Sequence, residues 1–460
     1  MKLFPFNLLF ILLFACRETT AISGEESEFP FKNYELNDNG SINSTEIYID
    51  DFKPSENCYT CHVAHYTEWS QSMHAYSMRD PVFFSGWNIE QTKRAETGER
   101  FCVQCHSPAA FVSGIDLSGH LTAEELIASD HPPAIKEGIG CTVCHSMTDL
   151  SPTIHAKDIV AANAKYFMNP GEDVYYGSIK NPIPNDYHDS EYNPAFSRSE
   201  SCLPCHDMTV RGVEAEITFT EWNRIPGLAM GNLLSCQECH MPPIIRPAAI
   251  GGPERIVHRH TFVGVDLDLS LPIEDNPQFD DVKALLENAV EISFGTPLDS
   301  LPISISSGDS LHIPLTISSL TAHSLPSGVS FAREVWIELL IRNENNVLYS
   351  SGYISSDSSA LDLSDPDLIF FNSTLYDENG IETGSVTDVH SMENNSLMGF
   401  SHQYRKYSIK LPDEVSNYLE ITARMLFRPF KPSILATHPE LLKNLPVFEM
   451  EHISQTININ

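Results

Sequence analysis

Ten of the eleven cysteines lie in five copies of one pentapeptide, Cys-x-x-Cys-His. Two such thiols can form thioethers with the vinyl groups of a porphyrin, and the adjacent imidazole can then bind the iron as its proximal ligand. A shuffled chain of this composition would contain about 0.01 such pentapeptides. The predicted attachment residues are Cys58, Cys61, Cys102, Cys105, Cys141, Cys144, Cys202, Cys205, Cys236 and Cys239, and the predicted proximal ligands are His62, His106, His145, His206 and His240.

Three other uses of paired cysteines fit this pattern less well. Zinc ribbons contain Cys-x-x-Cys pairs but do not require a His after every second Cys. A disulfide across two intervening residues would close a small, strained loop. Redox-active pairs of the thioredoxin type need an α/β context, which the surrounding sequence lacks. We therefore predict five covalently bound haem c groups, each with iron, as the cofactors.

The remaining histidines supply candidates for the distal side of each iron. A second imidazole gives six-coordinate iron suited to electron transfer, whereas an open position can bind a substrate. His65 lies on the same helix face as His62 and cannot bind the same iron, although it could serve another. His120, His131 and His155 are weaker candidates, with a surface role as the alternative. The main distal candidates are His74, His188, His258 and His260.

The first fifteen residues predict export. Lys2 is followed by an apolar run that is too short to span a bilayer and has the form of a secretory signal. The run ends in Leu-Phe-Ala before Cys16, which resembles a bacterial lipobox, and in such signals the Cys becomes the lipidated first residue. The alternative is an ordinary signal peptide with a nearby cleavage site. We expect a periplasmic or cell-surface protein that is anchored to a membrane, with the outer membrane preferred.

The chain divides by pattern into five segments, and the fold expected is multidomain. A mostly α-helical and irregular region, in which porphyrins supply much of the apolar core, precedes an all-β sandwich. The sandwich follows from a hydrophobic period of two, as in Leu311–Ile317, Val335–Ile341 and Leu419–Phe427. The expected segments are a signal peptide (1–15), an acidic tether (16–57), a pentahaem domain (58–262), a connecting segment with a helix (263–294) and the β-sandwich (295–460).

The charge excludes some partners. The formal net charge of −34 would repel phosphate groups, so we expect no nucleic-acid binding. The same charge favours redox protein partners with cationic contact surfaces. A lipid anchor at Cys16 would provide the contact with a membrane, and the β-domain could support an oligomer.

Several haem segments resemble a known family. CYTCHVAHYTEWSQSMHA, EGIGCTVCHS, FSRSESCLPCHD and FTEWNRIPGLAMGNLLSCQECHMPP, with HRHTFVG after them, are similar to multihaem cytochromes c. That family includes the tetrahaem electron carrier of ammonia-oxidising bacteria and is distantly related to hydroxylamine oxidoreductase. The resemblance implies distal roles for His74, for His188 and for one of His258 and His260.

The C-terminal half resembles a β-domain that is often appended to these cytochromes, through AHSLPSGVSFAREVWIELLI and FRPFKPSIL…LPVFEM. In that pattern a Gly usually precedes the His that His323 matches, and here the residue is Ala322. A ligand role for His323 is therefore an open hypothesis of the resemblance.

Three functions remain in consideration. The first is electron relay through closely spaced, His-ligated haems, with motifs three and four, or four and five, expected as stacked pairs. The second is an oxidoreductase of a small nitrogen or sulfur compound at one five-coordinate haem, although no Cys-x-x-Cys-Lys motif of the nitrite-reductase type occurs. The third is a structural subunit of an extracellular electron-transfer assembly, with the β-domain as the docking module.

Overall fold

Most of the chain after residue 46 is described by the computed structural model. The chain divides into two compact units, Met1–Phe31 and Lys32–Asn460, and only residues of the second are described. The expected signal segment, Cys16, the tether up to residue 46 and His155 lie outside the described residues. The described ranges are 47–93, 98–149, 167–225, 234–344, 346–356, 360–415 and 417–460.

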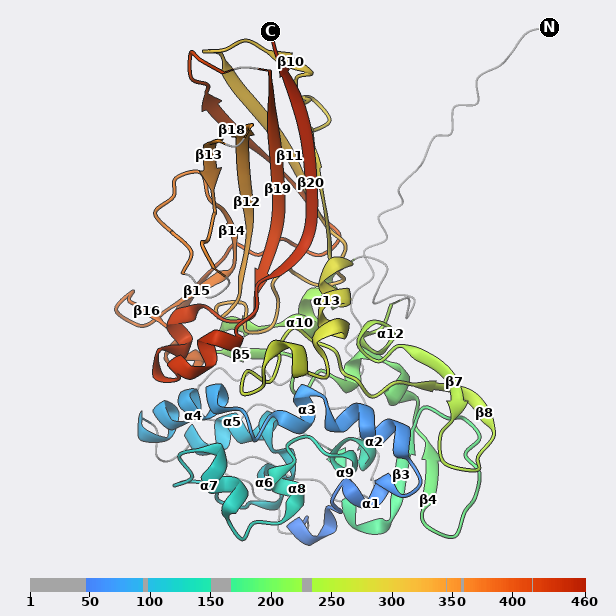
Figure 1. Ribbon diagram of the computed structural model, residues 1–460. Coiled ribbons are helices and arrows are strands. Elements are labelled where there is room, and N and C mark those ends of the chain that lie inside the picture. Colours follow the sequence, from blue (N-terminus) through green and yellow to red (C-terminus); the bar gives the residue numbers. More distant parts are fainter. Residues whose placement is uncertain are drawn as a thin grey trace, which may run out of the picture. The chain divides into compact units, whose positions relative to one another are not determined.

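Short helices connected by long loops carry the cysteine motifs (Figure 1). The longest has 13 residues and several have only one or two turns. Helices this short are not stable alone and depend on tertiary packing. They are α1 (Glu56–Tyr59), α2 (Val63–Ser70), α3 (Met73–Tyr76), α4 (Pro81–Lys93), α5 (Gly98–His106), α6 (Pro108–Ser113), α7 (Ala123–Ala128), α8 (Pro133–Lys136), α9 (Cys141–His145), α10 (Thr218–Arg224), α12 (Cys236–His240) and α13 (Phe279–Glu287).

The motifs use helical turns to direct their side chains. The third motif forms α9, the fifth forms α12, and the second ends α5. Residues three apart in a helix share a face, so the two cysteines of such a motif are presented to the same side. In these three motifs the helix thus presents both thiols in one direction.

The sequence predicts a short helix over 123–129 with Thr122 as its N-cap, and a helix after the first motif through Tyr66, Trp69 and Met73. Thr122 is the N-cap of α7 and its hydroxyl accepts the backbone N–H of Glu125 at 3.2 Å, which confirms the expected start of that helix. The helix expected through Met73 is interrupted, because Ser72 is extended and separates α2 from α3. Its hydroxyl donates to the carbonyl of Trp69 at 2.7 Å, so the side chain closes the end of α2.

In the described chain, four two-stranded ribbons lie in the segments after the third, fourth and fifth motifs. In the last of them, β7 and β8 pair antiparallel, with Ile245 opposite Ile256. Isolated ribbons are marginal in water, so these depend on side-chain contacts to neighbouring segments. The pairs are β1 (Met147–Asp149) with β2 (Phe167–Met168), β3 (Val174–Gly177) with β4 (Asp189–Tyr192), β5 (Met208–Val210) with β6 (Val213–Glu216), and β7 (Pro243–Pro247) with β8 (Glu254–His258).

The C-terminal region is rich in strands, which form three main sheets. The largest has the order β10-β20-β19-β12-β13, with β14 also on β12; the second has the order β18-β11-β9; and the third has the order β16-β15-β17. Their bounds are β9 (Val290–Phe294), β10 (Ser304–Ile305), β11 (Ser310–Ser319), β12 (Glu334–Asn343), β13 (Asn346–Ser351), β14 (Ile369–Phe371), β15 (Ser373–Tyr376), β16 (Glu382–Thr383), β17 (Ser391–Asn394), β18 (His402–Lys410), β19 (Tyr418–Arg428) and β20 (Phe448–Ile459).

One apolar core joins the first two of these sheets. It contains Ile313 and Leu315 of β11 together with Ile337 and Leu339 of β12. β12 differs from the expected strand with one buried face, because Trp336 on its other face is also fully buried. Trp336 packs in a second cluster with residues of the loop after β13, so both faces of this strand are covered.

Side chains tie the strand-rich region to the motif region. Glu221 of α10 accepts hydrogen bonds from the backbone N–H of Ser324 at 3.1 Å and from the hydroxyl of Ser327 at 2.6 Å. Arg333 pairs with Asp266. These contacts hold the loop between β11 and β12 against the motifs. Within the described ranges, none of the helices combines the length and apolarity needed to cross a bilayer.

Candidate functional site

One cavity of about 3220 Å³ is lined by all ten motif cysteines and all five motif histidines. Single small-molecule pockets measure about 300–1,000 Å³, so this space can hold several large groups. We number the sites by motif in chain order. Site 1 contains His62, site 2 His106, site 3 His145, site 4 His206 and site 5 His240.

Four of the five motif histidines face a second histidine across the cavity. The partners come from distant parts of the chain, and one of them lies in the strand-rich region. The pairs are His62 with His188 at 6.2 Å, His145 with His260 at 6.0 Å, His206 with His74 at 6.2 Å and His240 with His323 at 6.3 Å between ring centres.

These separations suit an iron between two imidazoles. A metal–nitrogen bond to His is about 2 Å long, and the ring centre lies roughly 1 Å behind the nitrogen, which places two axial rings about 6 Å apart. A value of 6.0 to 6.3 Å recurs at four separate motif histidines. The side chains present therefore fit covalently bound haem c with two axial histidines.

The second ring nitrogens are held by the backbone. Nδ1 of His62 lies 2.8 Å from the carbonyl oxygen of Ala248, and Nδ1 of His145 lies 2.7 Å from that of Tyr176. A hydrogen bond at Nδ1 fixes the tautomer and orientation that leave Nε2 for a metal. The same arrangement occurs at His240, His188, His260 and His323, whose Nδ1 atoms contact backbone carbonyls at 2.5 to 3.0 Å.

Burial keeps several of these rings neutral. It lowers the pKa of His74 and of His260 to about 3, and the pKa of His240 to about 4. Neutral imidazole is the form that binds a metal. His206 differs: burial lowers its pKa, but the hydrogen bond and charge of Glu216 outweigh that effect and raise the pKa to about 9. A carboxylate behind an axial imidazole increases its basicity as a ligand.

Site 2 has a different environment. Among the described residues, His106 has no histidine opposite it; its ring instead stacks on Phe83, with centres 3.9 Å apart and planes at 13°. Burial lowers the pKa of His106 to about 4. Site 2 therefore has a proximal imidazole within an aromatic wall, and the described chain gives it no distal imidazole.

Other histidines named from the sequence lie elsewhere. His65 contacts His260 edge to face at 4.7 Å, which is closer than two ligands of one iron would lie. Nδ1 of His258 lies 2.6 Å from the carbonyl of Met241, and no ring contact in the described chain joins it to a motif histidine. Of the alternatives His258 and His260, the geometry thus favours His260. His120 and His131 lie 5.1 Å apart, away from the motif histidines.

Cysteine side chains of different motifs contact one another. Interactions between thiols join Cys58 to Cys141, Cys202 to Cys236, and Cys105 to Cys205. Sites 1 and 3, sites 4 and 5, and sites 2 and 4 are therefore neighbours. Of the stacked pairs expected from the sequence, four with five has such a contact. The described residues contain no group of three or more His, Cys, Asp or Glu side chains of the kind that holds zinc.

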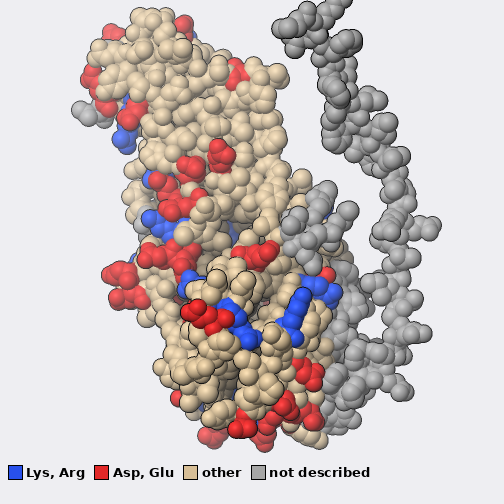
Figure 2. Space-filling model, turned by 90° about the vertical axis from the view of Figure 1, so that its right-hand side faces the viewer, with Lys and Arg blue, Asp and Glu red and all other residues tan. Residues whose placement is uncertain are grey.

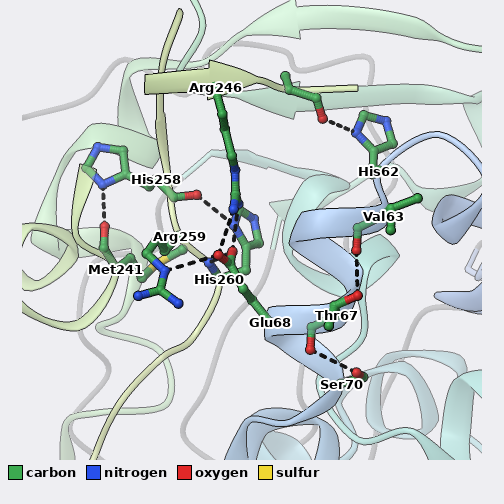
Figure 3. A network of polar contacts seen from close by, with 11 residues as sticks. His62, Val63, Thr67, Glu68, Ser70, Met241, Arg246, His258, Arg259 and His260 are labelled. Atoms are coloured by element: carbon green, nitrogen blue, oxygen red, sulfur yellow. Dashed lines mark hydrogen bonds and ion pairs between the residues drawn. The ribbon is translucent and has the colours of Figure 1, made fainter. Parts of the chain in front are cut away.

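A partly buried carboxylate network joins the helix after the first motif to the segment that carries His260 (Figure 3). Glu68 of α2 accepts two hydrogen bonds from Arg246 at 2.7 Å, one from Arg259 at 3.1 Å and one from the backbone N–H of His260 at 2.9 Å. Burial raises its pKa, but these donors together lower the pKa of Glu68 to about 2. The network fastens the β7–β8 ribbon to the helix that follows the first motif.

Comparison with known proteins agrees with this geometry. Residues 57–146 match the family Cytochrome c554 and c-prime. The chain is similar in structure to a penta-haem cytochrome c552 from Thermochromatium tepidum, with a TM-score of 0.61 and 19% sequence identity over 88% of this chain and 99% of that one. At that identity the likeness concerns the fold. Together with the motifs, these findings support a multihaem cytochrome c with covalently bound haem.

Other matched structures cover less of the chain. A CARDB domain of the PF1109 protein from Pyrococcus furiosus covers 37% of this chain and 86% of its own, with 8% identity and a TM-score of 0.17. A β-glucosidase from Listeria innocua covers 37% of this chain and 16% of its own, with 11% identity and a TM-score of 0.15. Neither carries an argument about function. No curated protein matches the chain significantly.

The spacing of residues around the motifs did not predict His323 as a ligand candidate. It lies 83 residues after His240, in the loop between β11 and β12, and only the family resemblance drew attention to it. Glu68 was also missed, because a single Glu in an amphipathic helix normally suggests a solvated position.

Proposed function

We propose that this protein is an exported pentahaem c-type cytochrome that relays electrons. The proposal is carried by the four imidazole pairs at 6.0 to 6.3 Å, since two axial histidines make an iron suited to electron transfer rather than to substrate binding. When bound, each haem supplies one-electron chemistry between ferric and ferrous iron. The protein would hold each haem through two thioethers and a proximal imidazole, with a second imidazole at four of the five sites.

The cysteine contacts support an order for the relay. Site 1 adjoins site 3, site 4 adjoins site 5, and site 2 adjoins site 4. Cys205 of site 4 also lies close enough to Cys144 of site 3 to raise the pKa of the Cys144 thiol. The resulting order is 1–3–4–5, with site 2 as a branch at site 4. In this proposal the C-terminal sheets form a β-sandwich whose loop supplies His323 to site 5.

Haem counting and spin-state measurements test the relay. Mass spectrometry and a pyridine-haemochrome assay of the exported protein should give five haems per chain. Ferric EPR spectra should contain low-spin signals for at least four of them. Bare thiols at the motifs, or a majority of high-spin iron, would refute the proposal.

A separate observation, at site 2, supports a second candidate function. His106 lacks an opposing histidine among the described residues, so site 2 is the place where a small nitrogen or sulfur compound could bind iron. A ferric high-spin EPR signal that cyanide or nitrite abolishes would support this oxidoreductase. Spectra without any high-spin component would remove it.

The location and the partners follow from the sequence. We propose lipid attachment at Cys16 and export, with the outer membrane preferred; labelling with a radioactive fatty acid and its loss in Cys16→Ser tests the anchor. The partners proposed are redox proteins with cationic contact surfaces. Figure 2 shows acidic side chains scattered over one face, with a few Lys and Arg side chains in its lower half. A structural subunit remains the third proposal, and dispersed monomers at high concentration would oppose it.

A further inference from the structure

Two parts of the chain repeat one short pattern around a pair of motifs. In the first part, Ser55 lies three residues before the first motif. The segment Tyr66-Thr67-Glu68-Trp69 lies between the first motif and the third motif. In the second part, Ser199 lies three residues before the fourth motif. The segment Phe219-Thr220-Glu221-Trp222 lies between the fourth motif and the fifth motif. The repeated residues make the same kinds of contact in both places.

The two serines hold the helices of sites 3 and 5. The hydroxyl of Ser55 accepts the backbone N–H of Cys141 at 2.8 Å, and the hydroxyl of Ser199 accepts that of Cys236 at 3.0 Å. Both serines are buried. Each therefore satisfies an N–H that the first turn of a helix leaves without an intrahelical partner.

The two tryptophans hold the segments that lead into the same helices. The indole N–H of Trp69 donates to the carbonyl of Ile139 at 2.8 Å, and that of Trp222 donates to the carbonyl of Leu234 at 2.9 Å. Each acceptor lies two residues before the first cysteine of its motif. The ring of each tryptophan is buried, so the bond is shielded from water.

The two glutamates hold the segments that carry the distal histidines. Glu68 accepts the backbone N–H of His260 itself at 2.9 Å. Glu221 accepts the backbone N–H of Ser324 at 3.1 Å, and Ser324 directly follows His323. One helix in each part thus contacts both sides of a site, namely the attachment segment through its Trp and the distal segment through its Glu.

The spacing between the repeated elements explains why the pattern is easily overlooked. Trp69 and Ile139 are 70 residues apart, whereas Trp222 and Leu234 are 12 apart. The longer interval contains the whole of site 2. The first cysteines of the two motifs also contact each other in both parts.

We infer that sites 1 and 3 and sites 4 and 5 are two copies of one two-haem module, in which a Ser–Glu–Trp clamp positions the second site. The clamp residues are Ser55, Glu68 and Trp69 in the first copy and Ser199, Glu221 and Trp222 in the second. Glu68 and Glu221 are positioning residues for the distal ligands His260 and His323. Site 2 is an insertion into the first copy. This inference rests on the proposed function, because it assumes haem at the sites.

The experiment removes each glutamate and measures ligand release in the purified holoprotein. Glu68→Ala and Glu221→Ala should each raise carbon monoxide binding by the reduced protein by up to one equivalent per chain above the parent, with loss of one low-spin EPR signal in the ferric form. Haem content should stay at the parent value, since no cysteine is changed. Glu221→Gln retains an acceptor oxygen for Ser324 and should return the spectra toward the parent.

Matched controls come from the equivalent positions Glu56 and Glu200, which follow the two clamp serines. Ala at either position removes the same charge from the same module, and the carbon monoxide stoichiometry should not change. If the control and clamp variants behave alike, the effect is one of charge and the inference is wrong.

A double-variant series assigns each glutamate to its site. His323→Ala opens site 5, so adding Glu221→Ala should release no further ligand, whereas adding Glu68→Ala should release a second. The inference is wrong if Glu221→Ala releases a further ligand in the His323→Ala background and Glu68→Ala does not. It is also wrong if no single variant changes carbon monoxide binding. Either result would leave the haem count of the proposed function intact. A protein without haem would instead refute the proposed function.

Milder substitutions can test the inference if an Ala variant does not yield mature holoprotein. Trp69→Phe and Trp222→Phe remove the indole hydrogen bond to the attachment segment and keep a smaller aromatic ring at each position. Each should shift the EPR signal of one low-spin haem, at site 3 and site 5 respectively, and leave the others unchanged. Spectra identical to the parent in both variants would also count against the clamp.

Discussion

His323 lies 6.3 Å from His240 between ring centres, with the two ring planes at 17°. One of these residues belongs to the fifth motif and the other to the loop between β11 and β12. The strand-rich region therefore completes a site whose attachment residues lie in the helical region. In the proposed function this region takes part in ligation, through His323, as well as in covering the cavity.

Replacing His323 with Ala should make site 5 high-spin without loss of covalent haem. The cause is the loss of the imidazole opposite His240, while the thioethers and the proximal ligand remain. Ferric EPR and haem quantitation measure the two effects separately. His312→Ala, an exposed position on β11, is the control and should retain the parent spectrum. A fully low-spin His323→Ala protein would show that another group binds this iron.

Asp80 should make the protein less stable as the pH rises from about 4 to 7. Burial raises its pKa to about 7, with Asp266 and Asp268 acting in the same direction against a hydrogen bond from the backbone of Val82. The folded state therefore binds a proton in this range that the unfolded state has released, so stability is lost as the pH rises through the range.

Asp80→Asn removes this titration but retains a side chain that can cap α4. At pH 8 it should increase the free energy of unfolding by on the order of 1–3 kcal/mol, and at pH 4 by little. Thermal unfolding across this pH range measures the difference. Asp186→Asn, at an exposed position, should follow the parent curve. A constant offset at all pH values would contradict the assignment.

Glu334→Gln should destabilise the strand-rich region by about 3 kcal/mol. Glu334 of β12 pairs with Arg428 of β19 at 2.5 Å, and Arg428 is fully buried with its guanidinium 5.5 Å from the ring centre of Trp336. Removing the carboxylate charge takes an ion-pair partner away from the buried cation. Chemical denaturation followed by tryptophan fluorescence measures the loss.

The exposed Glu378 supplies the control for that variant, since Glu378→Gln removes the same charge at the surface. Haem spectra of Glu334→Gln should match the parent under native conditions, because no motif residue is involved. Equal stability of the two variants would mean that Arg428 finds compensation elsewhere.

Electron transfer to a cationic redox protein should depend strongly on salt. The net charge of −34 attracts a positively charged c-type cytochrome, and ions screen this attraction. Stopped-flow measurements should give a second-order rate that falls at least about tenfold between low ionic strength and 0.2 M. An anionic acceptor should show the opposite trend. A rate with either partner that does not respond to salt would oppose partner selection by charge.

The sequence by itself determined the chemistry of attachment. Each Cys-x-x-Cys-His pentapeptide contains all its functional groups within five residues, so no tertiary information is needed to recognise it. The period-two strands around Ile313 and Ile421 were predictable for a similar reason, because one buried face imposes alternation along a single strand. Local patterns sufficed wherever the interacting groups were neighbours in the chain.

Only the tertiary structure decided which histidines lie opposite each other. His188, His74, His260 and His323 are separated from their partners by tens of residues or more, and loop closure places no fixed spacing on such pairs. His258 and His260 are two residues apart, a spacing that puts both on the same side of an extended strand, so alternation does not distinguish them. Strand β8 ends at His258, and only the fold shows that His260 is the one that faces a motif histidine. The clamps of Glu68 and Glu221 likewise join segments that the sequence keeps apart, since the fold alone brings a backbone N–H to each carboxylate.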